Sequence, residues 1–194
     1  RTVDVKGLCE KEVKADKVIW PLTYKVVGND LSTTLGLVEA NNATVLDFLR
    51  KGGINESEIT ISATQISDKY ASEYGNNDRV YRYLCTSVIT VCSSEVDKVL
   101  ELQGRQDALL KSGVTLAAND WENKTQFKFE GLNEIKPQMI EDATANAREA
   151  AQKFAKDSGS RLGKIKTATQ GTFSIEDRDS NTPYIKRVRV VTYV

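Results

Sequence analysis

The sequence predicts an α+β fold, with largely antiparallel sheets in two-layer sandwiches and three helices that cover one face. Segments in which apolar residues alternate are interspersed with segments in which apolar residues recur at helical spacing. Their order is ββα-ββα-βα-ββ, which lacks the strict β-α alternation of a parallel sheet. The chain has 194 residues, 40% of them hydrophobic and 28% charged, as is typical of a globular protein.

Two strands are expected at the start of the chain. Residues 1–7 alternate between polar and apolar side chains, and Gly7 is expected to end this strand. Residues 16–27 alternate as well, with apolar or aromatic side chains at the even-numbered positions from 18 onward. Pro21 cannot donate a ladder hydrogen bond, so we expect an edge position or a bulge there.

A helix and a third strand follow. Apolar side chains recur at helical spacing over residues 30–51, where Asp30 or Ser32 can cap the first turn. Gly52-Gly53 suits the exit from this helix. Residues 57–67 then alternate as a strand, with Ile59 and Ile61 on one side. Ile66 would fall on the opposite side, so we expect a bulge or the end of the strand near Gln65.

The segment 68–79 is polar and rich in turn residues, which makes it the best candidate for a seam between two lobes. We expect a single domain over 1–194, which could thus consist of two lobes at about 1–76 and 77–194. The C-terminal strands could return to the first of these lobes.

The next three elements are a strand, a helix and a short strand. Residues 80–92 are rich in aromatic and β-branched side chains and predict a long strand. A capped helix is expected over 94–113, with a kink at Gly104, where its apolar stripe is interrupted. Residues 125–131 alternate over a short strand.

The helix expected over 136–158 is the clearest element, and two strands, 164–176 and 184–194, complete the fold. Pro137 suits the first turn of this helix. Because the apolar stripe is rich in alanine, the helix can lie close against a sheet. The stripe consists of Ile140, Ala143, Ala147, Ala150, Ala151 and Phe154.

Composition excludes several classes of function. The chain has no histidine, which removes every Ser-His or Cys-His nucleophile pair and every histidine metal ligand. Its 27 basic and 27 acidic side chains give a formal net charge of zero, so no global field favours nucleic acid or an anionic membrane. No apolar run approaches the length of about 20 residues that a membrane span requires.

The three cysteines, Cys9, Cys85 and Cys92, are too few for a disulfide framework and lack the spacing of a zinc site. We interpret them as small packed apolar residues. Cys85 and Cys92 lie seven positions apart, so in a regular strand they face opposite sides. A redox or peroxide-scavenging role for these thiols is the alternative.

Motifs that suggest chemistry have structural explanations. Residues 159–164 look like a phosphate loop but fit a helix exit better. The basic run at 186–189 alternates with valines as a half-exposed strand requires. Residues 177–182 match only part of a calcium loop, and the acidic stretch Glu176–Asp179 is the one candidate for a small-molecule or metal site. We therefore predict no catalytic, cofactor-binding or metal-ligating residue.

The ends of the chain suggest a mature form. Arg1 opens it without a methionine, and it stops inside the strand-like run Val188–Val194. We expect that an export signal or a membrane anchor has been removed.

Five motifs are spread over nearly the whole chain, namely Val3-Asp-Val5-Lys-Gly7, Glu12-Val-Lys-Ala15-Asp16, Leu49-Arg-Lys-Gly52-Gly53-Ile54, the helix Ala143–Ala155, and Ser158-Gly-Ser-Arg-Leu-Gly-Lys-Ile165. Together they resemble the SIMPL-domain family, also described as oxidative-stress defence proteins. The resemblance implies a bacterial protein, exported to the periplasm or cell envelope, with no established enzymatic activity or catalytic residues. It also implies an association with tolerance of oxidative stress.

The first functional hypothesis is accordingly a non-enzymatic envelope protein that works by oligomerisation or by binding a protein partner. Long strands leave edges to be covered, and pairing between chains is one way to cover them. We expect a homo-oligomer, with no cofactor, no nucleic acid and no transmembrane segment. The alternatives are a cysteine-dependent redox protein and a small-molecule or metal-binding module.

Overall fold

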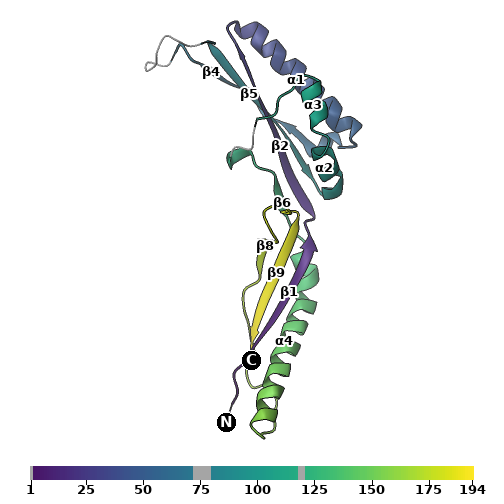
Figure 1. Cartoon of the computed structure of the whole chain (residues 1–194), viewed down its shortest axis with the longest axis vertical. Coiled ribbons are helices and arrows are strands. Elements are labelled where there is room, and N and C mark those ends of the chain that lie inside the picture. Colours follow the sequence, from purple (N-terminus) through teal and green to yellow (C-terminus); the bar gives the residue numbers. More distant parts are fainter. Residues whose placement is uncertain (1, 72–79, 118–120) are drawn as a thin grey trace. The chain divides into compact units, whose positions relative to one another are not determined.

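The computed structural model of the chain describes residues 2–71, 80–117 and 121–194 (Figure 1). The fold is α+β, as predicted, with two antiparallel sheets. The chain forms two compact units. Unit 1 comprises the residues up to Asp16 together with Phe127–Val194, and unit 2 comprises Lys17–Gln126. The expected boundary at residues 76 and 77 lies outside the described residues and stays a prediction.

Unit 1 is a four-stranded antiparallel sheet with one long helix packed on it. Strand β9 lies in the middle, pairing with β1 along one edge and with β7 and β8 in succession along the other. The last strands therefore return to the first one. The elements are β1 (Lys6–Lys14), α4 (Leu132–Asp157), β7 (Thr169–Gln170), β8 (Ser174–Asp177) and β9 (Ile185–Tyr193).

Gly7 is where helix and sheet approach most closely. A Cβ atom at this position would lie 1.8 Å from the carbonyl oxygen of Ala143 and 2.6 Å from the backbone nitrogen of Ala147. The small alanines of the predicted stripe thus let α4 lie on the backbone of β1. The expectation that Gly7 ends a strand is wrong. β1 starts at Lys6 and runs through this glycine. The residue is glycine because the helix above it leaves no room for a side chain.

Asp16 fixes the start of α4. Its carboxylate accepts hydrogen bonds from the backbone N–H groups of Glu130, at 2.8 Å, and Gly131, at 2.9 Å. These donors lie next to the positive end of the helix, where a carboxylate is stabilised. The helix begins at Leu132, about a turn before the expected start, so Pro137 lies inside it and not in its first turn.

Unit 2 is a second antiparallel sheet, in the order β3-β5-β2-β6 with β4 also on β5. Helices α1, α2 and α3 lie on the same side of it (Figure 1). The strands of this sheet are β2 (Lys17–Gly28), β3 (Ile59–Ile61), β4 (Gln65–Asp68), β5 (Tyr83–Ser93) and β6 (Gln126–Lys128), of which β6 spans the boundary between the two units. The helices are α1 (Leu31–Lys51), α2 (Val96–Gln103) and α3 (Asp107–Lys111), with short 3-10 turns at Glu56–Glu58 and Trp121–Asn123.

The core of unit 2 follows the predicted pattern of β2. Its even-numbered side chains from Val18 to Tyr24 are buried beneath the helices, and Asp30 caps α1 as expected. The placement of Pro21 at a sheet edge is wrong, because β2 lies between β5 and β6. The N–H of Ala117 donates to the carbonyl of Thr23, so odd-numbered residues of β2 direct their backbone groups away from β5. Pro21 therefore costs the β2–β5 ladder no hydrogen bond.

Three other elements differ from the expected ranges. The helix expected over 94–113 is divided into α2 and α3 near Gly104, where a kink was predicted. The strand expected over 57–67 is interrupted between β3 and β4, close to the predicted bulge. The strand expected over 164–176 is reduced to β7 and β8, because the residues just before Thr169 pair with no other strand in the described part of the chain.

Candidate binding cleft

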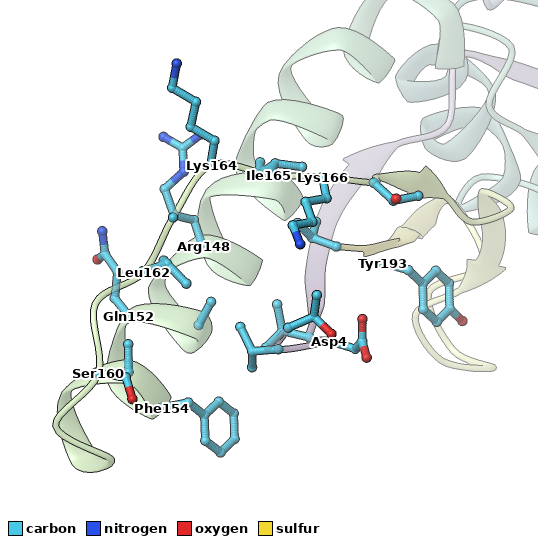
Figure 2. A pocket seen from close by; sticks show the side chains of 18 of the residues that line it. Asp4, Arg148, Gln152, Phe154, Ser160, Leu162, Lys164, Ile165, Lys166 and Tyr193 are labelled. Atoms are coloured by element: carbon cyan, nitrogen blue, oxygen red, sulfur yellow. The ribbon is translucent and has the colours of Figure 1, made fainter.

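Unit 1 contains an open cleft of about 1200 Å³ (Figure 2). The extended residues 2–6 line one wall, and the segment 158–168, which we call the crossing segment, lines the other. The C-terminal half of α4 forms the floor. Tyr193, the last residue of β9, and the adjacent Val194 line the inner end of the cleft.

The cleft begins where the hydrogen-bonded ladder of the sheet stops. The backbone groups of Val5 and Val194 bond each other in both directions, at 2.9 and 3.0 Å. On the other side, Tyr193 pairs with Thr169 of β7. Beyond these pairs, residues 161–168 and 2–4 make no backbone hydrogen bond within the described parts of the chain. The two walls thus carry free backbone donors and acceptors, which elsewhere in the sheet are paired.

Apolar side chains that would normally be buried are exposed in this cleft. Phe154, which the sequence places on the packed stripe of α4, is 62% exposed, so that expectation is wrong. Phe154 is exposed because α4 extends past the last paired residues of the sheet, so no strand among the described residues covers this part of the helix. The other large apolar side chains exposed here are Val3 (39%), Leu162 (39%), Ile165 (44%) and Tyr193 (44%). Exposed apolar side chains that gather in one place mark an interaction site more often than a plain surface.

The cleft is also cationic. Its lining includes five basic side chains, namely Lys6, Arg148, Arg161, Lys164 and Lys166, and one acidic side chain, Asp4. Among the described residues, the four cations from α4 and the crossing segment have no ion pair. Other basic side chains of the protein do, as in Arg82–Asp68 at 3.0 Å and Arg187–Glu10 at 3.3 Å. The field of these cations favours an anionic partner.

The outer edge of β1 is a poorer candidate for an interface. The pairing of Val5 with Val194 directs the odd-numbered residues of β1 toward β9, so the even-numbered ones direct their backbone groups outward. The carbonyl of Leu8 already accepts a hydrogen bond from the side chain of Asn146, at 2.8 Å. α4 lies directly over Gly7 of β1. If the β1 strands of two copies paired, their two α4 helices would therefore lie closer together than the usual interaxial distance of about 8–10 Å.

Sequence reasoning assigned residues 159–164 to a helix exit, and this is confirmed. Gly159 has a positive φ of 66°, and the N–H of Ser160 donates to the carbonyl of Ala155 at 2.8 Å. The same reasoning missed that this stretch and the residues after it line a cleft. The alternation of Lys164, Ile165 and Lys166 is the signal that could have indicated it, since it is typical of a strand edge.

The cysteines do not form a thiol site. Cys85 is buried and Cys92 is exposed, which confirms that they face opposite sides of β5. Burial raises the pKa of the Cys85 thiol. Burial and the neighbouring carboxylate of Asp142 raise the pKa of the Cys9 thiol. A raised pKa lowers the thiolate fraction, which is the reactive form.

The carboxylates of the acidic loop bind within the protein. Asp177 pairs with the buried Lys186, and Asp179 accepts hydrogen bonds from Arg178, Asn181 and Thr182. Within residues 2–71, 80–117 and 121–194, no group of three or more Cys, Asp or Glu side chains is placed to hold a metal ion.

Asp179 is expected to titrate far below an ordinary aspartate. The hydrogen bonds from Thr182 and Arg178 lower its pKa from 3.8 to about 2. Since the folded-state pKa is depressed, the loop is stabilised at pH values above 3.8, and this stabilisation is lost as the pH falls through about 2. Carboxyl NMR titration checks the midpoint, and Asp179→Asn should remove this low-pH transition. A midpoint near 3.8 would contradict these bonds.

Comparison with known proteins identifies the family of this chain. A search of curated proteins found no significant match. Within the described ranges, no helix is long and apolar enough to cross a membrane. The family model described as SIMPL, protein of unknown function (DUF541), matches residues 3–190. The proteins of this family are generally extracytoplasmic. Because the match spans nearly the whole chain, the protein belongs to the SIMPL family.

Proposed function

We propose that the protein is a non-enzymatic binding protein of the bacterial periplasm or cell envelope. It works by attaching to another protein chain, as a homo-oligomer or with a different partner, and contributes in this way to tolerance of oxidative stress. The cell-envelope location and the link to oxidative stress rest on the family resemblance. The mode of action rests on the cleft of unit 1.

The observation that carries this proposal is the exposure of Phe154 and its apolar neighbours beside unpaired cations. Leaving a phenylalanine side chain in water forgoes about 1.5–3 kcal/mol of burial free energy. A partner that covers the cleft recovers part of it. Association through this face therefore has a hydrophobic driving force.

A binding role also suits the chemistry of the side chains. General acid–base and nucleophilic catalysis need a titratable group held near a reacting atom, often a histidine. The sequence has no histidine, and the thiols of the half-buried Cys9 and the buried Cys85 have raised pKa values. These features favour binding over catalysis and over the redox alternative.

The test measures native mass by light scattering across a range of protein concentrations, together with capture of partners from an envelope extract. We expect a mass above that of one chain, or a captured partner, and we expect Phe154→Ser to weaken the association by about tenfold or more. Leu110→Ser is the matched control, since Leu110 is 59% exposed in unit 2, outside the cleft.

Two results would contradict the proposal. One is a monomer at all concentrations with no captured partner. The other is an association that Phe154→Ser and Leu110→Ser weaken equally, because the cleft would then not be the contact. Circular dichroism of both variants checks that the exposed substitutions leave the fold intact.

A further inference from the structure

The outer edge of the sheet in unit 2 offers a second surface for association. β3 and β4 lie in succession along β5, and within the described ranges no strand pairs with their other side (Figure 1). We infer that this edge, which we call the β3–β4 edge, pairs with the same edge of a second copy of the chain. The inference does not rest on the cleft, which belongs to unit 1.

The register on β5 shows which backbone groups of the edge face outward. Ser62, just after β3, and Lys69, just after β4, each donate a backbone N–H to the opposite chain segment. Because bonded residues alternate along an antiparallel strand, Ile61 and Ile66 direct their N–H and carbonyl groups away from β5. These groups make no other backbone hydrogen bond in the described part of the chain, so they are available to a partner.

A β-bulge separates the two halves of the edge. Ile61 lies opposite Ile89 and Gln65 lies opposite Thr86, so four steps along the edge match three steps along β5. If two copies pair antiparallel about a two-fold axis through the bulge, Ile61 of each copy lies opposite Ile66 of the other. Both residues have outward backbone groups, so each such pair can exchange two hydrogen bonds.

The side chains on the two sides of the bulge match each other in kind. In the same register Thr60 lies opposite Ser67 and Ser62 lies opposite Gln65, while isoleucine faces isoleucine. Hydroxyl pairs and β-branched pairs that face each other across antiparallel strands stabilise the sheet. A foreign strand would need this pattern by coincidence, whereas a second copy has it by symmetry. We therefore assign the edge to a second copy.

The edge also lacks the features that protect exposed strands. Residues 59–67 contain no charged residue and no proline, whereas the outer strands β1, β6 and β8 each contain a charged residue. Charges and prolines on an edge strand disfavour pairing with another chain. Ile61 and Ile66 are each 46% exposed, although the residues opposite them on β5 are buried. Asp68, which ends β4, is ion-paired with Arg82 of its own chain at 3.0 Å.

The helices of unit 2 leave room for such a pairing. α1 packs on β5 and β2, inside the edge. In the paired sheet the β5 strands of the two copies would be three strand spacings apart, about 14 Å. Two α1 helices above them would thus be farther apart than the usual interaxial distance of about 8–10 Å. The outer edge of β1 does not meet this requirement, because α4 lies directly over β1.

The first experiment measures the mass of the full chain by sedimentation over a range of concentrations. The chain carries Phe154→Ser, which removes the proposed contact of the cleft, and we expect a reversible dimer to remain. Ile66→Lys should raise its dissociation constant by about tenfold or more, because the lysine would lose water inside the paired sheet. Ile175→Lys is the matched control and should leave the dimer unchanged, since Ile175 is 38% exposed on β8 of unit 1.

A charge swap tests the register. Ile61→Lys and Ile66→Glu chains should each dimerise weakly alone. When mixed, they should form a heterodimer about tenfold more tightly, because the lysine of one chain then faces the glutamate of the other. The control mixture combines Ile61→Lys with Ile61→Glu, whose charges do not face each other, so it should not recover. Circular dichroism of each chain checks that these substitutions leave the fold intact.

Three results would overturn the inference, namely a monomer at all concentrations, a dimer that Ile66→Lys and Ile175→Lys weaken equally, and equal recovery in the two mixtures. A monomer whose Ile61 and Ile66 amides become protected in an envelope extract would equally overturn it, because the edge would then bind a foreign strand. Since the edge is tested without the cleft contact, its failure leaves the proposed function intact. That function fails alone if Phe154→Ser changes neither mass nor partner capture in the Ile66→Lys chain.

Discussion

Replacing Gly7 with alanine is expected to destabilise unit 1 by about 3 kcal/mol or more, the upper end of the usual cost of overpacking a core. The added Cβ would lie 1.8 Å from the carbonyl oxygen of Ala143, and both atoms belong to regular backbone that cannot give way cheaply. Either α4 must move off the sheet or β1 must leave its register. Both changes expose the apolar layer between them.

Hydrogen exchange of α4 peptides, with urea unfolding followed by far-UV circular dichroism, measures this loss. Gly36→Ala is the matched control, because a Cβ there meets nothing within 4 Å inside α1. It should stabilise by about 0.5–1 kcal/mol through the higher helix propensity of alanine. Trp20 is buried in unit 2, so its fluorescence reports on the unit that does not contain Gly7. A Gly7→Ala chain as stable as the parent would contradict the close approach.

Removing the carboxylate of Asp16 is the second large expected effect. Asp16→Ala should destabilise unit 1 by about 2–3 kcal/mol, because the N–H groups of Glu130 and Gly131 lose a charged acceptor at the start of α4.

Asp16→Asn is the graded control for this effect. It keeps the size of the side chain and one carbonyl acceptor, so about half of the loss should remain. Urea unfolding of the three chains under identical conditions gives the comparison. Equal stability of Asp16→Ala and the parent would show that these two hydrogen bonds do not anchor the helix.

Periodicity predicted the elements whose burial is one-sided and nearly complete. In β2 every second side chain from Val18 to Tyr24 is buried, and α1 has a capping Asp30 at its start. For such segments the local pattern and the tertiary packing agree, which is why the helices and the α+β class could be predicted. The position of Pro21 was mispredicted because its sheet neighbour β6 lies far along the chain.

β1 was mispredicted because its buried face carries so little apolar surface. Gly7 and Cys9 face the helix, while the outward positions are mostly charged, so no hydrophobic alternation marks the strand. A glycine inside a strand indicates a close backbone approach as readily as an end. Only the position of α4 distinguishes the two.

The cleft could not be predicted, since its residues have the pattern of ordinary structural elements. Phe154 continues the apolar stripe of α4, and residues 164–168 alternate as a strand does. Whether such side chains are buried depends on whether another strand lies beside them. That is a property of distant segments, and no local pattern contains it.

The most direct test of the cleft as the binding surface is hydrogen–deuterium exchange on the protein in its associated form, compared with the dissociated chain. The account predicts that amides over residues 161–168 and 2–4 exchange markedly more slowly on association, while the loop at Asp179 is unchanged. Slower exchange confined to other surfaces, with the two walls of the cleft exchanging as fast as before, would contradict it.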